Sequence, residues 1–206
     1  DDGRQLAAET AEVVFAAGGS LSRTRDFSTD VKARAEAAGR PAGLPLILPG
    51  AFVVVGDTEA EARALHAKLD SLVYWDSAIG ALSIALGVDA RAFDPDGPLP
   101  EDIPETNASK SGRERVLALA RSGRFTVRQL AQRLGGYAGL SFVGTPAGIA
   151  DRMEEYIAAG AADGFNILFS HLPGGLEDFC DKVIPELQRR GLFRTDYAGT
   201  TLRDHL

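Results

Sequence analysis

Short apolar runs alternate with segments of helical spacing along most of this chain. Residues 12–17 form the first apolar run, directly after helical spacing over residues 3–11. A longer run covers residues 44–56, and the later runs at 140–144 and 165–169 each precede a helical segment. Continuous apolar runs of this length are typical of parallel strands covered on both faces, and parallel strands need helical crossovers. The alternation therefore predicts an α/β fold with helices outside a parallel sheet.

Several boundary signals support the predicted helices. Ser20 or Ser22 is expected to cap a helix that stops at Gly39, and Thr58 is expected to cap the charged helix that follows residues 44–56. The Thr145–Pro146 pair starts another helix, because proline suits the first helical turn. The prolines within residues 44–56 predict a bend or an interruption of that strand.

The strand and helix pattern does not by itself distinguish a doubly wound sheet from a barrel. We favour a barrel because no Gly-rich dinucleotide motif follows the first strand, and because so few strands would leave both sheet edges open. A complete barrel has eight strands and about 250 residues. We therefore predict that residues 1–206 are the C-terminal half of one (β/α)8 TIM barrel, with a helical insertion at about 73–140 and a tail at about 191–206. The chain enters helical sequence at once, without Met or a signal peptide, which predicts an upstream part.

Composition excludes several partners. The formal net charge of −7 and the pI near 5.0 provide no basic field for nucleic acid or an anionic membrane. The longest apolar stretches, residues 44–55 and 79–88, look like strands and are too short to cross a bilayer. The only cysteine, Cys180, excludes an internal disulfide, and its helical neighbours predict a buried thiol. No Cys/His spacing indicates a metal site, and we expect a cytoplasmic protein.

Two segments are candidates for chemistry from the residues alone. Asp1–Arg4 begins a helix, where backbone N–H groups and the helix dipole favour an anion and Arg4 adds a cation. From the residues alone, an ordinary helix cap by Asp1 or Asp2, which satisfies those donors, is the favoured explanation of this segment. His171 follows a strand at its carboxyl end, where barrel active sites lie, and is an acid or base, a pocket-lining residue or a solvated side chain. Asn166 either points its amide into a barrel interior or pairs with backbone. No catalytic residue is identified.

Several motifs resemble one known family. Residues 143–151, with the sequence VGTPAGIAD, and residues 160–167 resemble the penultimate unit of bacterial-luciferase-like flavin monooxygenases. The C-terminal motifs are similar to the ending of the narrower nitrilotriacetate and dibenzothiophene-sulfone monooxygenase family; they are residues 172–179, 183–195 and 200–203. Further matches cover most of the remaining chain and are residues 31–35, 48–50, 55–62 and 106–107.

The resemblance implies an eight-stranded barrel and a two-component monooxygenase. In such families a separate NAD(P)H-dependent flavin reductase supplies reduced FMN, and one oxygen atom of O2 enters a small organic substrate. The enzymes are often homo-oligomers, and residues 1–206 alone are expected to be inactive. Two other functions stay open: an oxidoreductase of the same superfamily that uses a deazaflavin, and a noncatalytic barrel subunit that stabilises a catalytic partner.

The resemblance also assigns candidate site residues. Residues 3–8 match the helix start just after the family's phosphate-binding serine turn, which implies a serine before Asp1 and a cofactor-binding role for Asp2, Gly3 and Arg4. Phe169 and His171 match positions near the substrate, where the residue type varies within the family. The resemblance therefore implies no conserved role for His171. The segment at about 73–140 resembles the part that helps cover the pocket. The residues expected to line it there are Thr106 and Asn107.

Overall fold

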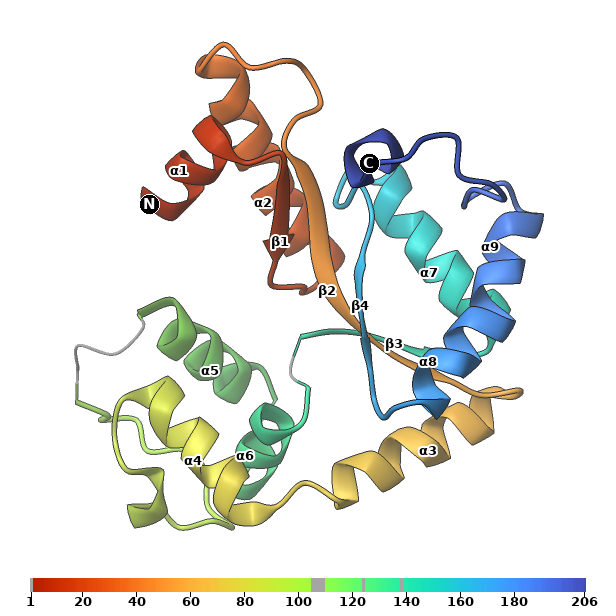
Figure 1. The fold of residues 1–206 in the computed structure, drawn as a ribbon. Coiled ribbons are helices and arrows are strands. Elements are labelled where there is room, and N and C mark those ends of the chain that lie inside the picture. Colours follow the sequence, from red (N-terminus) through yellow and green to blue (C-terminus); the bar gives the residue numbers. More distant parts are fainter. Residues whose placement is uncertain (1, 105–109, 124, 138) are drawn as a thin grey trace. The chain divides into compact units, whose positions relative to one another are not determined.

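The computed structural model describes residues 2–104, 110–123, 125–137 and 139–206 (Figure 1). These residues form two compact units. The first combines Asp1–Leu65 with Gly139–Leu206, and the second is His66–Ala138. The first unit holds every strand that pairs into the sheet, whereas the second is built from helices.

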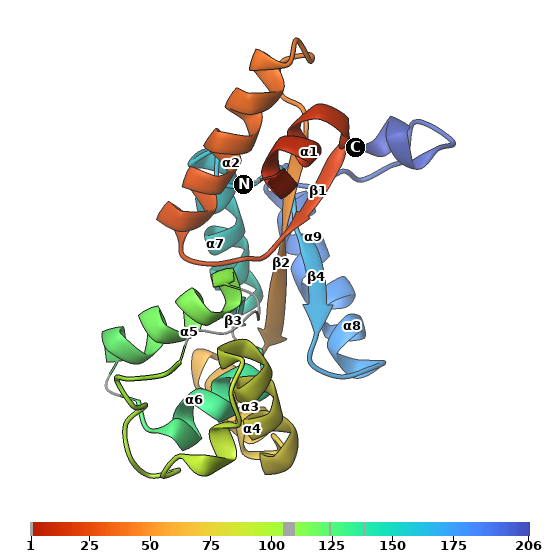
Figure 2. The ribbon, with the colours of Figure 1, turned by 90° about the vertical axis from the view of Figure 1, so that its left-hand side faces the viewer.

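A parallel sheet organises the first unit. Its strands are β1 (Val13–Ala16), β2 (Leu46–Val55), β3 (Leu140–Gly144) and β4 (Asn166–Phe169). The central strand β2 pairs with the other three strands, and all three pairings are parallel. In both ribbon views β2 and β4 run side by side (Figures 1 and 2). The predicted α/β class with a parallel sheet is therefore confirmed.

Strand β2 is continuous although it contains Pro49. The sequence predicted a bend or an interruption at the prolines, and the structure shows no interruption, because the strand extends over ten residues. Its partners change at the proline instead: the pairing with β1 ends at Pro49, whereas β4 begins opposite Gly50 and β3 begins opposite Ala51. A proline lacks the N–H donor of a strand ladder, so a change of partner at this position costs little.

The strand order differs from the order that consecutive barrel strands would have. In a barrel built in chain order, β4 would lie beside β3, but the structure pairs β4 with β2. The coarse architecture thus agrees with the sequence prediction.

Aromatic side chains pack the core of the first unit. Phe142 of β3 is 1% exposed, and its ring meets the rings of Tyr156 and Phe165 edge-on, with centroids 5.8 and 5.5 Å away. Tyr156 lies on α7 (Pro146–Ala158), and its hydroxyl donates to the carbonyl of Gly19 at 2.8 Å. Edge-to-face rings add to the free energy gained from burial. The cluster therefore joins β3, α7 and the loop after β1.

Helix α7 has the start that the sequence predicted. The Thr145 side chain accepts the N–H of Gly148 at 3.2 Å, and Pro146 occupies the first turn. The first unit also contains α1 (Asp2–Thr10) and α2 (Leu21–Ala37), whose cap is Ser20. Of the two serines offered by the sequence, Ser20 is therefore the cap.

The last long helical segment changes its pitch. The helical segment expected after residues 165–169 is divided in the structure into α8 (Gly174–Asp178), a π-helical segment η2 (Phe179–Val183) and α9 (Ile184–Arg189). Phe179 and Val183 of η2 are buried, whereas Cys180 is exposed. The prediction of a buried thiol was wrong, because Phe179 and Val183 occupy the face of this segment that points into the core and Cys180 lies outside that face. Helices α7 and α9 lie next to each other (Figure 1).

The second unit is helical throughout its described core. The apolar stretch at 79–88, expected to be strand-like, instead belongs mostly to α4 (Trp75–Leu86). Ile79, Leu82 and Leu86 are buried at helical spacing on one face of α4, which explains the error. The other helices are α5 (Lys110–Gly123) and α6 (Val127–Gly135), within the segment predicted to be a helical insertion, and η1 (Ala90–Ala92) is a short 3₁₀ turn.

Among the described residues, no single helix is long and apolar enough to cross a membrane. One bent pair, α3 (Glu59–Ser71) with α4, has the necessary length and apolar composition only when the two helices are counted together.

Candidate functional site

Polar groups gather where β2 and β3 end. Gly56, the residue after β2, donates its N–H to the carbonyl of Gly144 at 3.1 Å. Three residues later the chain enters α3 at Glu59, whose Oε1 atom accepts the N–H of Thr145 at 3.2 Å. The Thr58 side chain caps α3 by accepting the N–H of Glu61 at 3.2 Å. These bonds fix the loops at the carboxyl edge of the sheet, which is where ligands bind in parallel α/β folds.

A lysine from η2 reaches the same edge. The Nζ atom of Lys182 lies 2.9 Å from Asp57 Oδ1 and 3.1 Å from Asp178 Oδ1. The hydrogen bonds to Asp57 and then to Asp178 raise the pKa of Lys182, so that it stays protonated at neutral pH. Sequence reasoning missed this cluster. The available signal was the Gly56–Asp57–Thr58 loop directly after a buried strand, but its partner lies 125 residues away.

The structure brings Phe169 and His171 to the end of the neighbouring strand. Phe169 is the last residue of β4, is half-buried, and has its ring 6.1 Å from that of Phe179. His171 is exposed, and its Nδ1 atom lies 2.9 Å from the hydroxyl oxygen of Ser170. The imidazole lies over Gly174, where an added Cβ would come within 2.9 Å of Nε2. The glycine therefore permits a tight turn beneath the histidine.

Asn166 uses its side chain within the sheet. The Nδ2 group donates to the carbonyl of Leu48 at 3.0 Å. Of the two orientations that the sequence left open, the bond to neighbouring backbone is the one observed.

The predicted cofactor residues lie in the first turn of α1. Asp2 and Gly3 are exposed, and an added Cβ on Gly3 would meet no atom within 4 Å. Arg4 Nη1 donates to Asp30 Oδ2 at 2.7 Å, and the guanidinium stacks 5.2 Å from the centroid of the Phe27 ring. Asp30 also binds Arg34, and these two hydrogen bonds hold the pKa of the Asp30 carboxyl below its usual range. The Arg4–Asp30 ion pair holds the Arg4 side chain against α2, the helix that contains Asp30.

The topology sets where α1 begins. Figure 1 shows α1 running opposite to β1, the strand that follows it. A helix that precedes a parallel strand in this way starts toward the carboxyl edge of the sheet. Asp1 lies outside the described residues, so the alternative in which Asp1 caps α1 is outside them as well.

The remaining candidates are Thr106 and Asn107, and both lie outside the described residues. Within the described part of the chain, no group of three or more His, Cys, Asp and Glu side chains is arranged to hold a metal ion.

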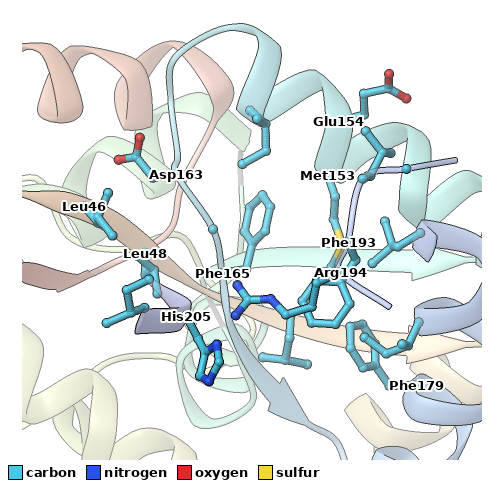
Figure 3. Close-up of a pocket in the computed structure, with 18 residues that line it drawn as sticks. Leu46, Leu48, Met153, Glu154, Asp163, Phe165, Phe179, Phe193, Arg194 and His205 are labelled. Atoms are coloured by element: carbon cyan, nitrogen blue, oxygen red, sulfur yellow. The ribbon is translucent and has the colours of Figure 1, made fainter. Parts of the chain in front are cut away.

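A cavity of about 670 Å³ lies at the opposite end of the strands (Figure 3). Its lining includes Leu46 and Leu48 from the start of β2, Phe165 from the residue before β4, and Ile167 from the start of β4. Neither Phe169 nor the residues of the α1 turn line this cavity. The cavity also reaches Phe179 of η2, whose ring contacts that of Phe169, so it borders the carboxyl-edge groups at that point.

Comparison with known proteins gives consistent matches. The family model for the luciferase-like monooxygenases matches residues 1–163. Nitrilotriacetate monooxygenase component A of Aminobacter aminovorans is 50% identical over 206 residues, which cover 99% of this chain and 46% of that protein. Dibenzothiophene-sulfone monooxygenase of Rhodococcus erythropolis is 34% identical over 209 residues, with 99% and 46% covered.

A solved structure gives a similar match. A riboflavin lyase, determined with modified FMN and riboflavin, superposes with a TM-score of 0.80 at 28% identity, covering 100% of this chain and 45% of that one. The chain spans about half the length of the curated relatives that it matches.

These matches confirm the resemblance that the motifs around residues 143–151 and 172–195 carry. They agree with both levels of that prediction, the broad flavin monooxygenase group and the narrower set of relatives. The chain belongs to the luciferase-like monooxygenase family.

Proposed function

We propose that the full-length protein is a two-component, FMN-dependent monooxygenase that uses reduced FMN and O2 to insert one oxygen atom into a small organic substrate. The match of residues 1–163 to the luciferase-like monooxygenases carries this proposal. Two relatives are named for the oxidation of organic molecules, and one of them is named component A, which supports a separate partner. That partner is a flavin reductase, and the protein is a cytoplasmic homo-oligomer.

The proposed architecture is a (β/α)8 barrel, of which residues 1–206 are the C-terminal part. Residues at about 73–140 form an insertion that helps cover the pocket, and residues at about 191–206 form the tail. The parallel sheet and the half-length coverage of the relatives support this arrangement. In such a barrel, active-site groups lie at the carboxyl ends of the strands.

Asp2, Gly3 and Arg4 fit the phosphate end of FMN. A helix start offers backbone N–H groups without partners in the helix, together with the positive end of the helix dipole. Gly3 leaves open space for close approach, and Asp30 holds the Arg4 guanidinium beside the turn. When bound, the reduced flavin would supply the electrons that activate O2.

The chain's own side chains would bind and enclose the substrate. Phe169 offers a half-buried aromatic surface at the carboxyl end of β4, and His171 next to it offers a polar group that can hydrogen-bond a substrate. Thr106 and Asn107 are proposed to line the same pocket from the insertion. The ion pairs of Lys182 with Asp57 and Asp178 hold the neighbouring loop in place. Excluding water from such a site is a main contribution of the protein.

Oxygen transfer from labelled O2 tests the proposal. The full-length protein is mixed with chemically reduced FMN, isotopically labelled O2 and either nitrilotriacetate or dibenzothiophene sulfone, and the products are examined by mass spectrometry. We expect one labelled oxygen atom per product molecule, and no labelled product when FMN is replaced by a deazaflavin. The matched control is the same mixture without protein.

Two results would contradict the proposal. Reversible hydride transfer with a deazaflavin, without oxygen incorporation, would indicate the related oxidoreductase. Absence of flavin binding, together with obligatory pairing to a different chain of the same fold, would indicate a noncatalytic subunit.

A further inference from the structure

The cavity at the amino ends of β2 and β4 has a mainly apolar wall. Leu46, Leu48 and Ile167 contribute from the sheet, and Met153 and Ile157 contribute from α7. Phe179, Ile184 and Leu187 contribute from η2 and α9, and residues 191–194 and 205–206 contribute from the C-terminal segment. The volume of about 670 Å³ lies in the range of about 300–1,000 Å³ that small organic ligands occupy.

The two acidic side chains of the wall each have a cationic neighbour. Asp163 binds Lys32 through Oδ1 at 2.7 Å and accepts the N–H of Ile47 through Oδ2 at 2.8 Å. Glu154 has its Oε2 atom 3.8 Å from a guanidinium nitrogen of Arg190, which also pairs with Glu186 and Asp151. Asp163 is therefore fully paired, whereas Glu154 shares its cation with two other carboxylates.

Arg194 supplies a cation without such compensation. Its guanidinium carbon stacks 5.6 Å from the ring centroids of both Phe193 and Tyr197. Among the described residues, no carboxylate lies within ion-pair distance of Arg194. Its carbonyl accepts a hydrogen bond from Gln188 at 2.8 Å, which ties this part of the segment to α9. Figure 3 shows the guanidinium extending into the space between Phe165 and His205.

We propose that this cavity binds an organic anion with an apolar body, such as a medium-chain carboxylate. The apolar body would lie against Leu48, Ile157 and Ile167, and the anionic group would accept hydrogen bonds from Arg194. A guanidinium suits a carboxylate because it offers two parallel N–H donors. His205, whose ring lies 4.8 Å from that of Tyr197, provides a second polar group beside Arg194. Residues 2–4 of the proposed flavin site do not line this cavity. Ligand binding to the cavity can therefore be measured directly, without following oxidation of a substrate.

Calorimetric titration of the full-length protein with octanoate, octanol and octylamine tests the proposal. Octanoate should bind saturably, and Arg194→Met should weaken it about tenfold, the loss expected for a charge-assisted hydrogen bond. Octanol affinity should stay unchanged in this variant, and octylamine should bind much more weakly than octanoate. The matched control is Arg25→Met, which removes an exposed arginine that does not line the cavity.

A second pair of variants tests the place of binding. Ile157 is 44% exposed on α7, so Ile157→Trp fills the cavity with little disturbance of the core and should weaken both octanoate and octanol. Ile84→Trp changes a 79% exposed isoleucine in the second unit and should change neither. Any of three results would overturn the proposal: no saturable octanoate binding, full octanoate affinity in Arg194→Met, or octylamine binding as tight as octanoate.

Discussion

Replacing Phe142 with alanine is expected to lower the free energy of unfolding by about 3–5 kcal/mol, because a large buried ring is lost and a cavity remains. The side chain is 1% exposed and contacts the rings of Tyr156 and Phe165. Both partners would lose their edge-to-face contacts at the same time. Urea denaturation of the full-length protein, followed by circular dichroism, measures the change.

The matched variant is Phe142→Leu. It keeps an apolar side chain of similar size, so it should cost about 1 kcal/mol, chiefly from the lost ring contacts. A Phe142→Ala loss as small as that of Phe142→Leu would show that this core is not packed as described.

Replacing Gly56 with alanine should also destabilise the protein, by about 1–3 kcal/mol, because the added methyl group has no room. An ideal Cβ there would lie 2.5 Å from the backbone nitrogen of Ala62 and 2.9 Å from the carbonyl oxygen of Thr58. Both are backbone atoms at the start of α3, so they cannot move aside as a flexible side chain would. The same urea denaturation experiment measures the effect.

Gly80→Ala is the opposite case. Gly80 lies inside α4, and an added Cβ would meet no atom within 4 Å. Alanine favours a helix interior over glycine, so this variant should gain about 0.5–1 kcal/mol. Equal effects of the two substitutions would contradict the close approach described at Gly56.

The sequence predicted the elements of the first unit because their physics is local. Buried parallel strands appear as apolar runs, and the caps at Ser20 and Thr145 depend on residues only three positions away. The apolar stretch at 79–88 misled because its length suits either a strand or a buried helix. Only the surrounding helices α5 and α6 decide in favour of α4.

The periodicity of apolar residues predicts neither the order of the strands nor ion pairs between residues far apart in the sequence. Nothing in the sequence of β4 states whether it lies beside β2 or β3. The Lys182–Asp57 ion pair likewise joins residues 125 positions apart. For the site, strand ends placed Phe169 and His171 at the carboxyl edge, because loops after parallel strands gather there. The cofactor role proposed for the α1 turn rests on family resemblance, since local physics favoured an ordinary helix cap.

The most direct test of the account compares phosphate recognition at the α1 turn. Reduced FMN and reduced riboflavin are titrated anaerobically into the full-length wild type, Arg4→Met and Arg34→Met. The two arginines bind the same carboxylate, Asp30, but Arg34 lies on α2. We predict that Arg4→Met weakens FMN about tenfold and leaves riboflavin, which lacks the phosphate, unchanged, whereas Arg34→Met keeps the wild-type preference. An equal preference for FMN over riboflavin in all three proteins would contradict the assignment of the flavin phosphate to this turn.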